Sequence, residues 1–387
     1  MLAGCFLLSV GFNGFIISPS SIAPLFAERF AVPQAAVGDV VSAVFVGTIL
    51  TQVPGGYLLD RYDNRWLVTV ATAGFVAVVV AIQAVSSFSV FLGLRVLGGV
   101  TAGFLFTAGA NAVGQVFDAE RTGFATGIYL ASPSVAFVAA HATSPLVGTT
   151  FGPLAVFPLH GLSTVLGTAL VWAGARGPVR GDDAPTVGEF ARALGNRSVI
   201  LVALSAGTVF AMYVFLNTWV PTYGQEVLEL PLWLAGVVAA LVPLVGIAAR
   251  PGGGWVSSRI GGRRRPVLVG GLVVGLALTV AIPFVGGVAP FLALLAAGAF
   301  SLQLGFGVYY VLAGELAAAG TEGTSLTLMT TISFTGSLVA PVAGGRLIAG
   351  PGWTAAFVAF GVIGAVGALA LVPVSEPGGA RAVSADD

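Results

Sequence analysis

The sequence predicts an all-α membrane protein in which twelve transmembrane helices form two similar six-helix bundles. Of the 387 residues, 57% are hydrophobic and only 8% are charged, whereas a soluble domain carries about a quarter charged residues. Twelve apolar stretches are each long enough to cross a bilayer, which takes roughly 20 residues of helix. A glycine and arginine pattern at the end of the second stretch also recurs about half the chain later.

The predicted spans are separated by short connections, except at one long polar segment that leaves six spans on each side. They lie near residues 3–27, 36–59, 66–86, 89–116, 123–147, 154–174, 199–221, 232–256, 266–286, 288–313, 324–347 and 352–373. We therefore expect an N-terminal bundle over 1–174, a cytoplasmic linker over 175–198, a C-terminal bundle over 199–373 and a disordered cytoplasmic tail over 374–387.

The positions of the arginines predict the orientation in the membrane, because cytoplasmic loops carry an excess of positive charge. With both termini in the cytoplasm, twelve arginines lie in inner loops, and only Arg29 and Arg346 lie in outer ones. The sequence therefore predicts a multi-pass protein of the cytoplasmic membrane with both termini in the cytoplasm.

Several functional classes are excluded by composition. The formal net charge is zero and there is no basic tail, which argues against binding to nucleic acid. One cysteine and two histidines in separate spans supply neither a metal site nor a nucleophile–base cluster, so we expect no metal, no cofactor and no enzyme activity. The expected partners are a small-molecule solute and the lipid bilayer, and the expected state is a monomer.

Two matching segments give the chain an internal repeat. "QVPGGYLLDRYDNRWL" begins at Gln52, and "RPGGGWVSSRIGGRRR" begins 198 positions later at Arg250. At this offset Gly56 aligns with Gly254, and Arg61 aligns with Arg259. Parallel repeats of this kind build many secondary transporters, whose solute site lies between the two halves near the bilayer midplane.

The first segment resembles the loop between spans two and three of the major facilitator superfamily, whose pattern is roughly Gly-x3-Asp-Arg-x-Gly-Arg-Arg. The matching residues are Gly56, Asp60, Arg61 and Arg65, while Asp63 and Asn64 replace the family's Gly and Arg. The second segment keeps Gly254, Arg259, Gly261 and Arg263, with Ser258 in place of the Asp. "RVLGG" from Arg95 and "FDAERTGFATG" at 117–127 are similar to the fourth-span and four–five loop patterns of the same family.

This resemblance implies a conformational latch, meaning contacts that break when a transporter changes conformation. Asp60 at the end of span two can accept hydrogen bonds and face a helix N-terminus, and Gly56 lets two helices approach closely. The predicted latch residues are Gly56, Asp60, Arg61, Arg65, Arg95, Gly254 and Arg259. The alternative is that the loop arginines only determine topology.

Two spans carry a polar residue near mid-depth, at positions related by the repeat. Arg250 lies nine residues before Arg259, about 13 Å along a helix, and Gln52 holds the equivalent depth in span two. A buried guanidinium recognises carboxylate, nitrate or phosphate oxygens. "ARPGGGWVSSRIGG" is similar to span eight of nitrate/nitrite porters, in which spans two and eight each supply an arginine. Here Gln52 replaces the first, which argues against nitrate specifically and leaves a monovalent organic or inorganic anion as a candidate solute. The alternative is that Arg250 pairs with a backbone carbonyl or a neighbouring helix.

In the resembled superfamily, spans one, four, seven and ten face the central cavity. Here these spans carry polar residues at helical spacing, so that each set shares one face. The predicted solute-binding residues are Arg250, Gln52, Asn111, Asn217, Tyr213, Gln303 and Tyr310. Taken singly, a polar residue in a membrane helix more often contributes to helix–helix packing than to ligand binding.

The sequence therefore predicts a secondary active transporter that moves a small polar solute by alternating access, with an anion as one candidate solute. Its coupling ion is left open. His141 in span five is a candidate proton carrier, and its alternative is an ordinary hydrogen-bonded histidine. The alternative functions are export of hydrophobic, drug-like compounds, or a non-transporting sensor on the same fold, for which we would expect an appended signalling domain.

Overall fold

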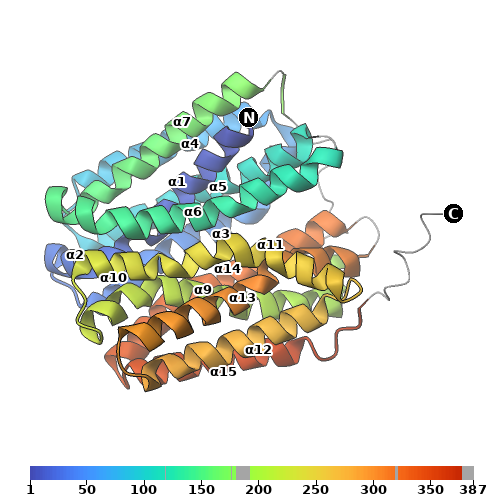
Figure 1. Ribbon diagram of the computed structural model, residues 1–387. Coiled ribbons are helices and arrows are strands. Elements are labelled where there is room, and N and C mark those ends of the chain that lie inside the picture. Colours follow the sequence, from blue (N-terminus) through green and yellow to red (C-terminus); the bar gives the residue numbers. More distant parts are fainter. Residues whose placement is uncertain (118, 176, 180–191, 319–320, 377–387) are drawn as a thin grey trace. The chain divides into compact units, whose positions relative to one another are not determined.

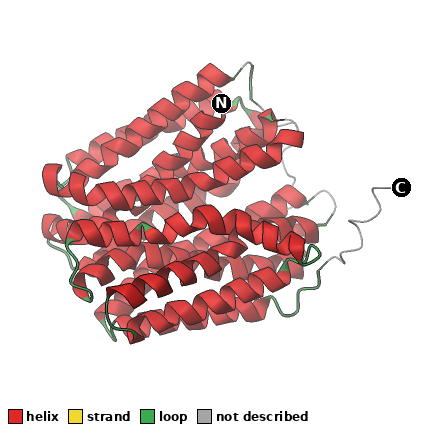
Figure 2. Cartoon of the chain, in the orientation of Figure 1, coloured by secondary structure: helices red, strands yellow, loops and turns green. Residues whose placement is uncertain are grey.

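The computed structural model describes residues 1–117, 119–175, 177–179, 192–318 and 321–376. Within these ranges it leaves out the side chains of residues 53, 60, 119–120, 122–123 and 322. The part of the chain so described is built from helices and connecting loops and holds no strand (Figure 2). Much of the predicted linker and tail lies outside it.

The described residues contain 12 helices that are long and apolar enough to cross a membrane. In the first half these spans are built from α1 (Leu2–Ile17), η1 (Ser18–Ile22), α2 (Ala23–Phe30), η2 (Gln34–Ala36), α3 (Val37–Arg61), α4 (Asn64–Gln83), α5 (Phe88–Val116), α6 (Ala119–Phe151), η3 (Pro153–Val156) and α7 (Phe157–Gly174). The all-α fold with six spans on each side of a polar segment is confirmed.

The second half of the described chain is also built from helices (Figure 1). Its elements are α9 (Arg197–Glu226), α10 (Leu232–Ala239), α11 (Leu241–Arg259), α12 (Arg265–Ala281), η4 (Ile282–Phe284), α13 (Val288–Leu316), α14 (Glu322–Ala349) and α15 (Trp353–Ala370). Both spans that end in the repeated segment carry a proline inside the helix, Pro54 in α3 and Pro251 in α11.

Contacts divide the chain into two compact units that do not coincide with the predicted bundles. The first unit contains residues 1–184, 215–244 and 338–349, and the second contains 185–214, 245–337 and 350–387. The helices α9, α11 and α14 therefore each contribute one end to the first unit and the rest to the second. The predicted bundle boundaries at residues 174 and 199 stay a prediction.

The first span is broken in its middle, between α1 and α2. Pro19 starts the 3-10 turn η1, and because proline has no backbone N–H, the carbonyl of Phe15 four residues earlier lacks its usual helical donor. The spacing of apolar residues does not reveal this break, since both sides of it are buried.

Candidate functional site

Arg250 lies on α11, half-buried, in the second compact unit. Its Nε and Nη2 donate hydrogen bonds to Gln303 Oε1 on α13, over 3.3 and 3.2 Å. The guanidinium carbon lies 4.7 Å from the ring centre of Phe306 and 5.5 Å from that of Tyr213. An amide oxygen and two aromatic faces therefore orient a cation inside a membrane span.

The surroundings of Arg250 are mainly aromatic. Phe306 packs against Phe210 at 4.6 Å between ring centres and edge-on against Tyr213 at 5.3 Å. Tyr310, seven residues after Gln303, interacts with Thr330 and with the charge of Arg250. The structure thus brings together four predicted solute-binding residues: Arg250, Gln303, Tyr213 and Tyr310.

The polar side chains of the first half form a second group, along α3 and α5. Gln52 is buried, and its Nε2 lies 3.5 Å from Thr107 Oγ1, a long hydrogen bond. One turn further along α5, Asn111 Oδ1 accepts a 3.0 Å hydrogen bond from Gln115 Nε2. Whether Gln52 and Asn111 share a cavity with Arg250 stays a prediction.

Asn217 lies one turn from Tyr213 on α9. It belongs to the first compact unit, where its Oδ1 lies 3.3 Å from His141 Nε2. The other ring nitrogen of His141 lies 2.6 Å from Ser21 Oγ in η1. His141 therefore links the broken first span to one end of α9. That Tyr213 and Asn217 both bind the solute stays a prediction.

Arg95 is fully buried on α5 and holds the break in the first span. Its Nη1 donates to Phe15 O, the carbonyl that Pro19 leaves without a donor, and its Nη2 donates to Ile16 O over 2.9 Å. Its Nε donates to Val40 O on α3 over 3.0 Å. These contacts support the structural side of its predicted role, and its part in gating stays a prediction.

The second histidine also contacts the break. Ser18 Oγ donates to Gly14 O over 2.7 Å and lies 2.6 Å from His160 Nε2. A hydroxyl has one proton, so with that proton on Gly14 O the imidazole must donate from Nε2. The Ser-Pro-Ser-Ser run at 18–21 is the sequence signal that could have identified this polar centre.

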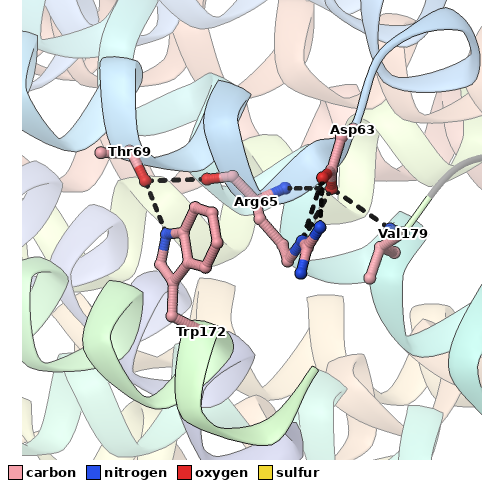
Figure 3. Close-up of polar contacts among 5 residues, drawn as sticks. All are labelled: Asp63, Arg65, Thr69, Trp172 and Val179. Carbon is pink, nitrogen blue, oxygen red and sulfur yellow. Dashed lines mark hydrogen bonds and ion pairs between the residues drawn. The ribbon is translucent and has the colours of Figure 1, made fainter. Parts of the chain in front are cut away.

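The loop between α3 and α4 is organised by Asp63, which departs from the family pattern (Figure 3). Asp63 accepts hydrogen bonds from Arg65 Nε at 3.0 Å and Nη2 at 2.7 Å, and from the Val179 amide at 3.2 Å. Val179 O in turn accepts from the Asn64 amide at 2.9 Å. The bonds from Arg65 hold the pKa of the Asp63 carboxyl below its ordinary value. This loop therefore binds the chain that follows α7.

The repeat extends to side-chain contacts at the ends of α3 and α11. The Arg61 guanidinium lies 4.4 Å from the Tyr57 ring centre, and Arg259 lies 4.9 Å from that of Trp255, each one turn back on its own helix. A latch role for Arg61, Arg65 and Arg259 stays a prediction, and the side chain of Asp60 lies outside the described residues.

The reason given for Gly56 needs correction. A Cβ at Gly56, or at its repeat partner Gly254, would meet no atom within 4 Å. The close approach falls one residue earlier: at Gly55, a Cβ would lie 3.1 Å from the Phe104 ring, and at Gly253, 1.8 Å from Leu304 O. In this conformation the first glycine of each pair faces the neighbouring helix, and the second faces away from it.

Known proteins resemble the chain in sequence and in fold. The profile of the Major Facilitator Superfamily matches residues 3–336. "Probable galactarate/D-glucarate transporter GudP" of Bacillus subtilis (strain 168) is 25% identical over 259 residues, 57% of this chain and 56% of that protein. "Probable nitrate/nitrite antiporter NarK1" of Thermus thermophilus is 28% identical over 230 residues, 56% of this chain and 51% of that protein. The chain spans about half the length of these curated relatives.

Solved structures share the fold at low sequence identity. A bacterial homologue of the human lysosomal transporter Spinster, in an inward-facing and unoccupied conformation, has a TM-score of 0.79 at 15% identity, with 95% of each chain covered. The same homologue in its occupied conformation has a TM-score of 0.79 at 18% identity, with 95% of this chain and 94% of that one covered. With a family profile over most of its length and twelve span-length helices, the chain belongs to the major facilitator superfamily, a family of multi-pass membrane transporters and not of enzymes.

Proposed function

We propose that this protein is a secondary active transporter whose solute is a small anion, bound through its negatively charged group at Arg250. The observation that carries the proposal is the position of the guanidinium, within the candidate membrane span Leu232–Arg259 and oriented by Gln303, Phe306 and Tyr213. A charge inside a membrane span is costly, so it is retained where it has a function. Guanidinium groups bind planar oxyanions through two parallel hydrogen bonds.

The relatives support an anionic solute. The proteins named for galactarate and D-glucarate and for nitrate and nitrite are both named for anions, although they differ from each other in solute size and charge. The aromatic side chains around Arg250 favour a solute with little need for hydroxyl-binding partners. We therefore place nitrate, nitrite and small monocarboxylates before the polyhydroxylated aldarates.

Transport by alternating access is part of the same proposal. In this mechanism the two halves rock about the solute site, which opens to one side of the membrane at a time. The distribution of arginines supports an orientation in which both termini lie in the cytoplasm. Cysteines introduced singly into the loops of a Cys5→Ser variant, and labelled with a membrane-impermeant maleimide from one side, test this orientation.

The test of the proposed solute site is the Arg250→Ala variant, reconstituted in liposomes and assayed for uptake of radiolabelled nitrate, nitrite, acetate and D-glucarate. Loss of the guanidinium should lower anion uptake by roughly 100-fold or more, because bonds to a charged group inside the membrane are lost. Arg250→Lys, which keeps the charge without the planar donors, should recover little. If Arg250→Ala transports anions as the unaltered protein does, the proposed anion site is wrong. Uptake or efflux of apolar dyes by both proteins would then favour the drug-type alternative.

Coupling to protons through His141 is a further part of the proposal. Its contacts with Ser21 and Asn217 join two spans within the first compact unit, so a proton taken up there would change a contact between them. The His141→Gln variant should lose uptake driven by a pH gradient and keep solute exchange at equal pH on both sides. Equal loss of both activities would mean that His141 has a structural role and is not the proton carrier.

A further inference from the structure

The side chain of Gln303 is held at both ends of its amide. It is 1% exposed, its Oε1 accepts from Arg250 Nε and Nη2, and its Nε2 donates to Ala299 O over 3.3 Å. Arginine has only donors, so the amide oxygen must face the guanidinium and the NH₂ group must face the backbone. The orientation of the amide therefore follows from its partners.

Gly246 provides the space for this amide. It lies one turn before Arg250 on α11, and a Cβ at this position would lie 2.0 Å from Gln303 Oε1 and 2.7 Å from its Cδ. Residues four apart on a helix share a face. The same face of α11 thus supplies both the donor and the space for its acceptor, and any side chain at residue 246 would displace the amide.

The bond between Gln303 and Arg250 limits how a solute can approach. A guanidinium offers two edges that match an oxyanion, the Nε–Nη2 edge and the terminal Nη1–Nη2 edge. The Gln303 oxygen occupies the first of these edges. That edge is therefore closed to a solute anion while the amide is in place.

We propose that Gln303 is the positioning and charge-selecting residue of the Arg250 site: its neutral amide holds the guanidinium by the Nε–Nη2 edge without neutralising it, in the space that Gly246 leaves. This inference rests on the proposed anion site. It changes the role predicted for Gln303, which acts on the solute through Arg250. A carboxylate at residue 303 would bind the same edge as an ion pair and would compete with the solute for the charge.

The experiment measures KM and maximal rate for nitrate and acetate uptake in liposomes. Gln303→Leu and Gly246→Ala should each raise KM by roughly 10- to 100-fold, the effect of a lost hydrogen bond to a charged group. Gln303→Glu should abolish saturable uptake of both anions. The matched control is Gly252→Ala on the same helix, whose Cβ would meet only Leu304 Cδ2 at 3.6 Å. Both glycine variants gain the same helix propensity, and the control should keep the KM of the unaltered protein.

A double-mutant cycle separates positioning from general damage to the fold. If Gly246 acts only by leaving space for the amide, Gln303→Leu should raise KM less in the Gly246→Ala variant than in the unaltered protein, because residues that act through one contact are not additive. Additive losses from Gly246→Ala and Gln303→Leu would overturn the inference, as would an unchanged KM in Gln303→Leu. Retained anion uptake in Arg250→Ala would instead overturn the proposed anion site itself.

A second readout does not depend on the solute. In protein labelled with ¹⁵N at the arginine Nε, the Arg250 Nε–H should exchange slowly with water while it is bonded to Gln303. Gln303→Leu and Gly246→Ala should both accelerate this exchange, and Gly252→Ala should not. If exchange in the unaltered protein is as fast as in these two variants, the amide does not fix the guanidinium. The inference would then be wrong whichever solute is transported.

Discussion

The two arginines inside the predicted spans, Arg95 and Arg250, are held in opposite ways. Arg95 is fully buried, and its guanidinium donates to three main-chain carbonyls from two helices. Arg250 is half-buried, and its Nε and Nη2 donate to one side-chain oxygen, Gln303 Oε1. Both guanidinium groups also pack on aromatic rings. Arg95 lies over Phe15 and Phe157, and Arg250 lies over Phe306 and Tyr213.

We propose that this difference separates a residue of the fold, Arg95, from a residue of the proposed solute site, Arg250. The carbonyls at Arg95 are fixed by the backbone, and one of them exists as an acceptor only because Pro19 breaks the first span. Gln303, which accepts from Arg250, is a side chain that substitution can change without moving a helix.

The largest effect on stability is expected for Arg95→Leu. Three hydrogen bonds from a fully buried guanidinium to main-chain carbonyls would be lost, each worth about 1 kcal/mol. The free energy of unfolding should fall by about 3 kcal/mol, the sum over the three carbonyls, measured as a lower midpoint of thermal unfolding in detergent. Arg250→Leu is the matched control, because Gln303 keeps its bond to Ala299 O.

Arg250→Leu should unfold within a few degrees of the unaltered protein while losing anion uptake. Equal destabilisation by both substitutions would mean that Arg250 also belongs to the fold. The contrast drawn between the two arginines would then be wrong.

A smaller effect is expected from two glycines at nearly equivalent positions of the repeat. A Cβ would lie 2.0 Å from Val96 O at Gly47 and 2.0 Å from Gln303 Oε1 at Gly246. The first neighbour is backbone, which can move only with its helix, and the second is the end of a flexible side chain. Gly47→Ala should therefore cost about 2 kcal/mol of unfolding free energy, and Gly246→Ala should leave the unfolding midpoint nearly unchanged and alter KM. The reverse order of unfolding midpoints would contradict this assignment.

Much of the fold was predictable because it rests on composition and spacing. The bilayer requires long apolar helices, so the twelve spans follow from hydropathy, and the repeat follows from Gly56, Arg61 and their partners at 254 and 259. The Arg250, Gln303 and Tyr310 set was predictable for a similar reason, since residues seven apart share a helix face.

The remainder depends on contacts that leave no periodic signal. Asn217 shares a face with Tyr213, yet α9 passes from one compact unit to the other between them, and nothing in the spacing marks that point. The choice between Gly55 and Gly56 depends on how α3 is rotated toward Phe104. Asp63 was noted only as a departure from the family pattern, and its partner Val179 is 116 residues away.

The smallest effect on stability is expected for substitution of Asp63, and this effect should disappear at low pH. The bonds from Arg65 lower the pKa of Asp63 in the folded protein, so the carboxylate stabilises the fold above its ordinary pKa, and this contribution is lost as pH falls through the lowered value. At neutral pH, Asp63→Asn should cost about 0.5 kcal/mol, the range of a partly exposed ion pair. The unfolding midpoints of the two proteins should converge as the pH is lowered below about 4. A difference that stays constant down to about pH 3, below the ordinary pKa of an aspartate, would show that the shape of the side chain, and not its charge, joins this loop to Val179.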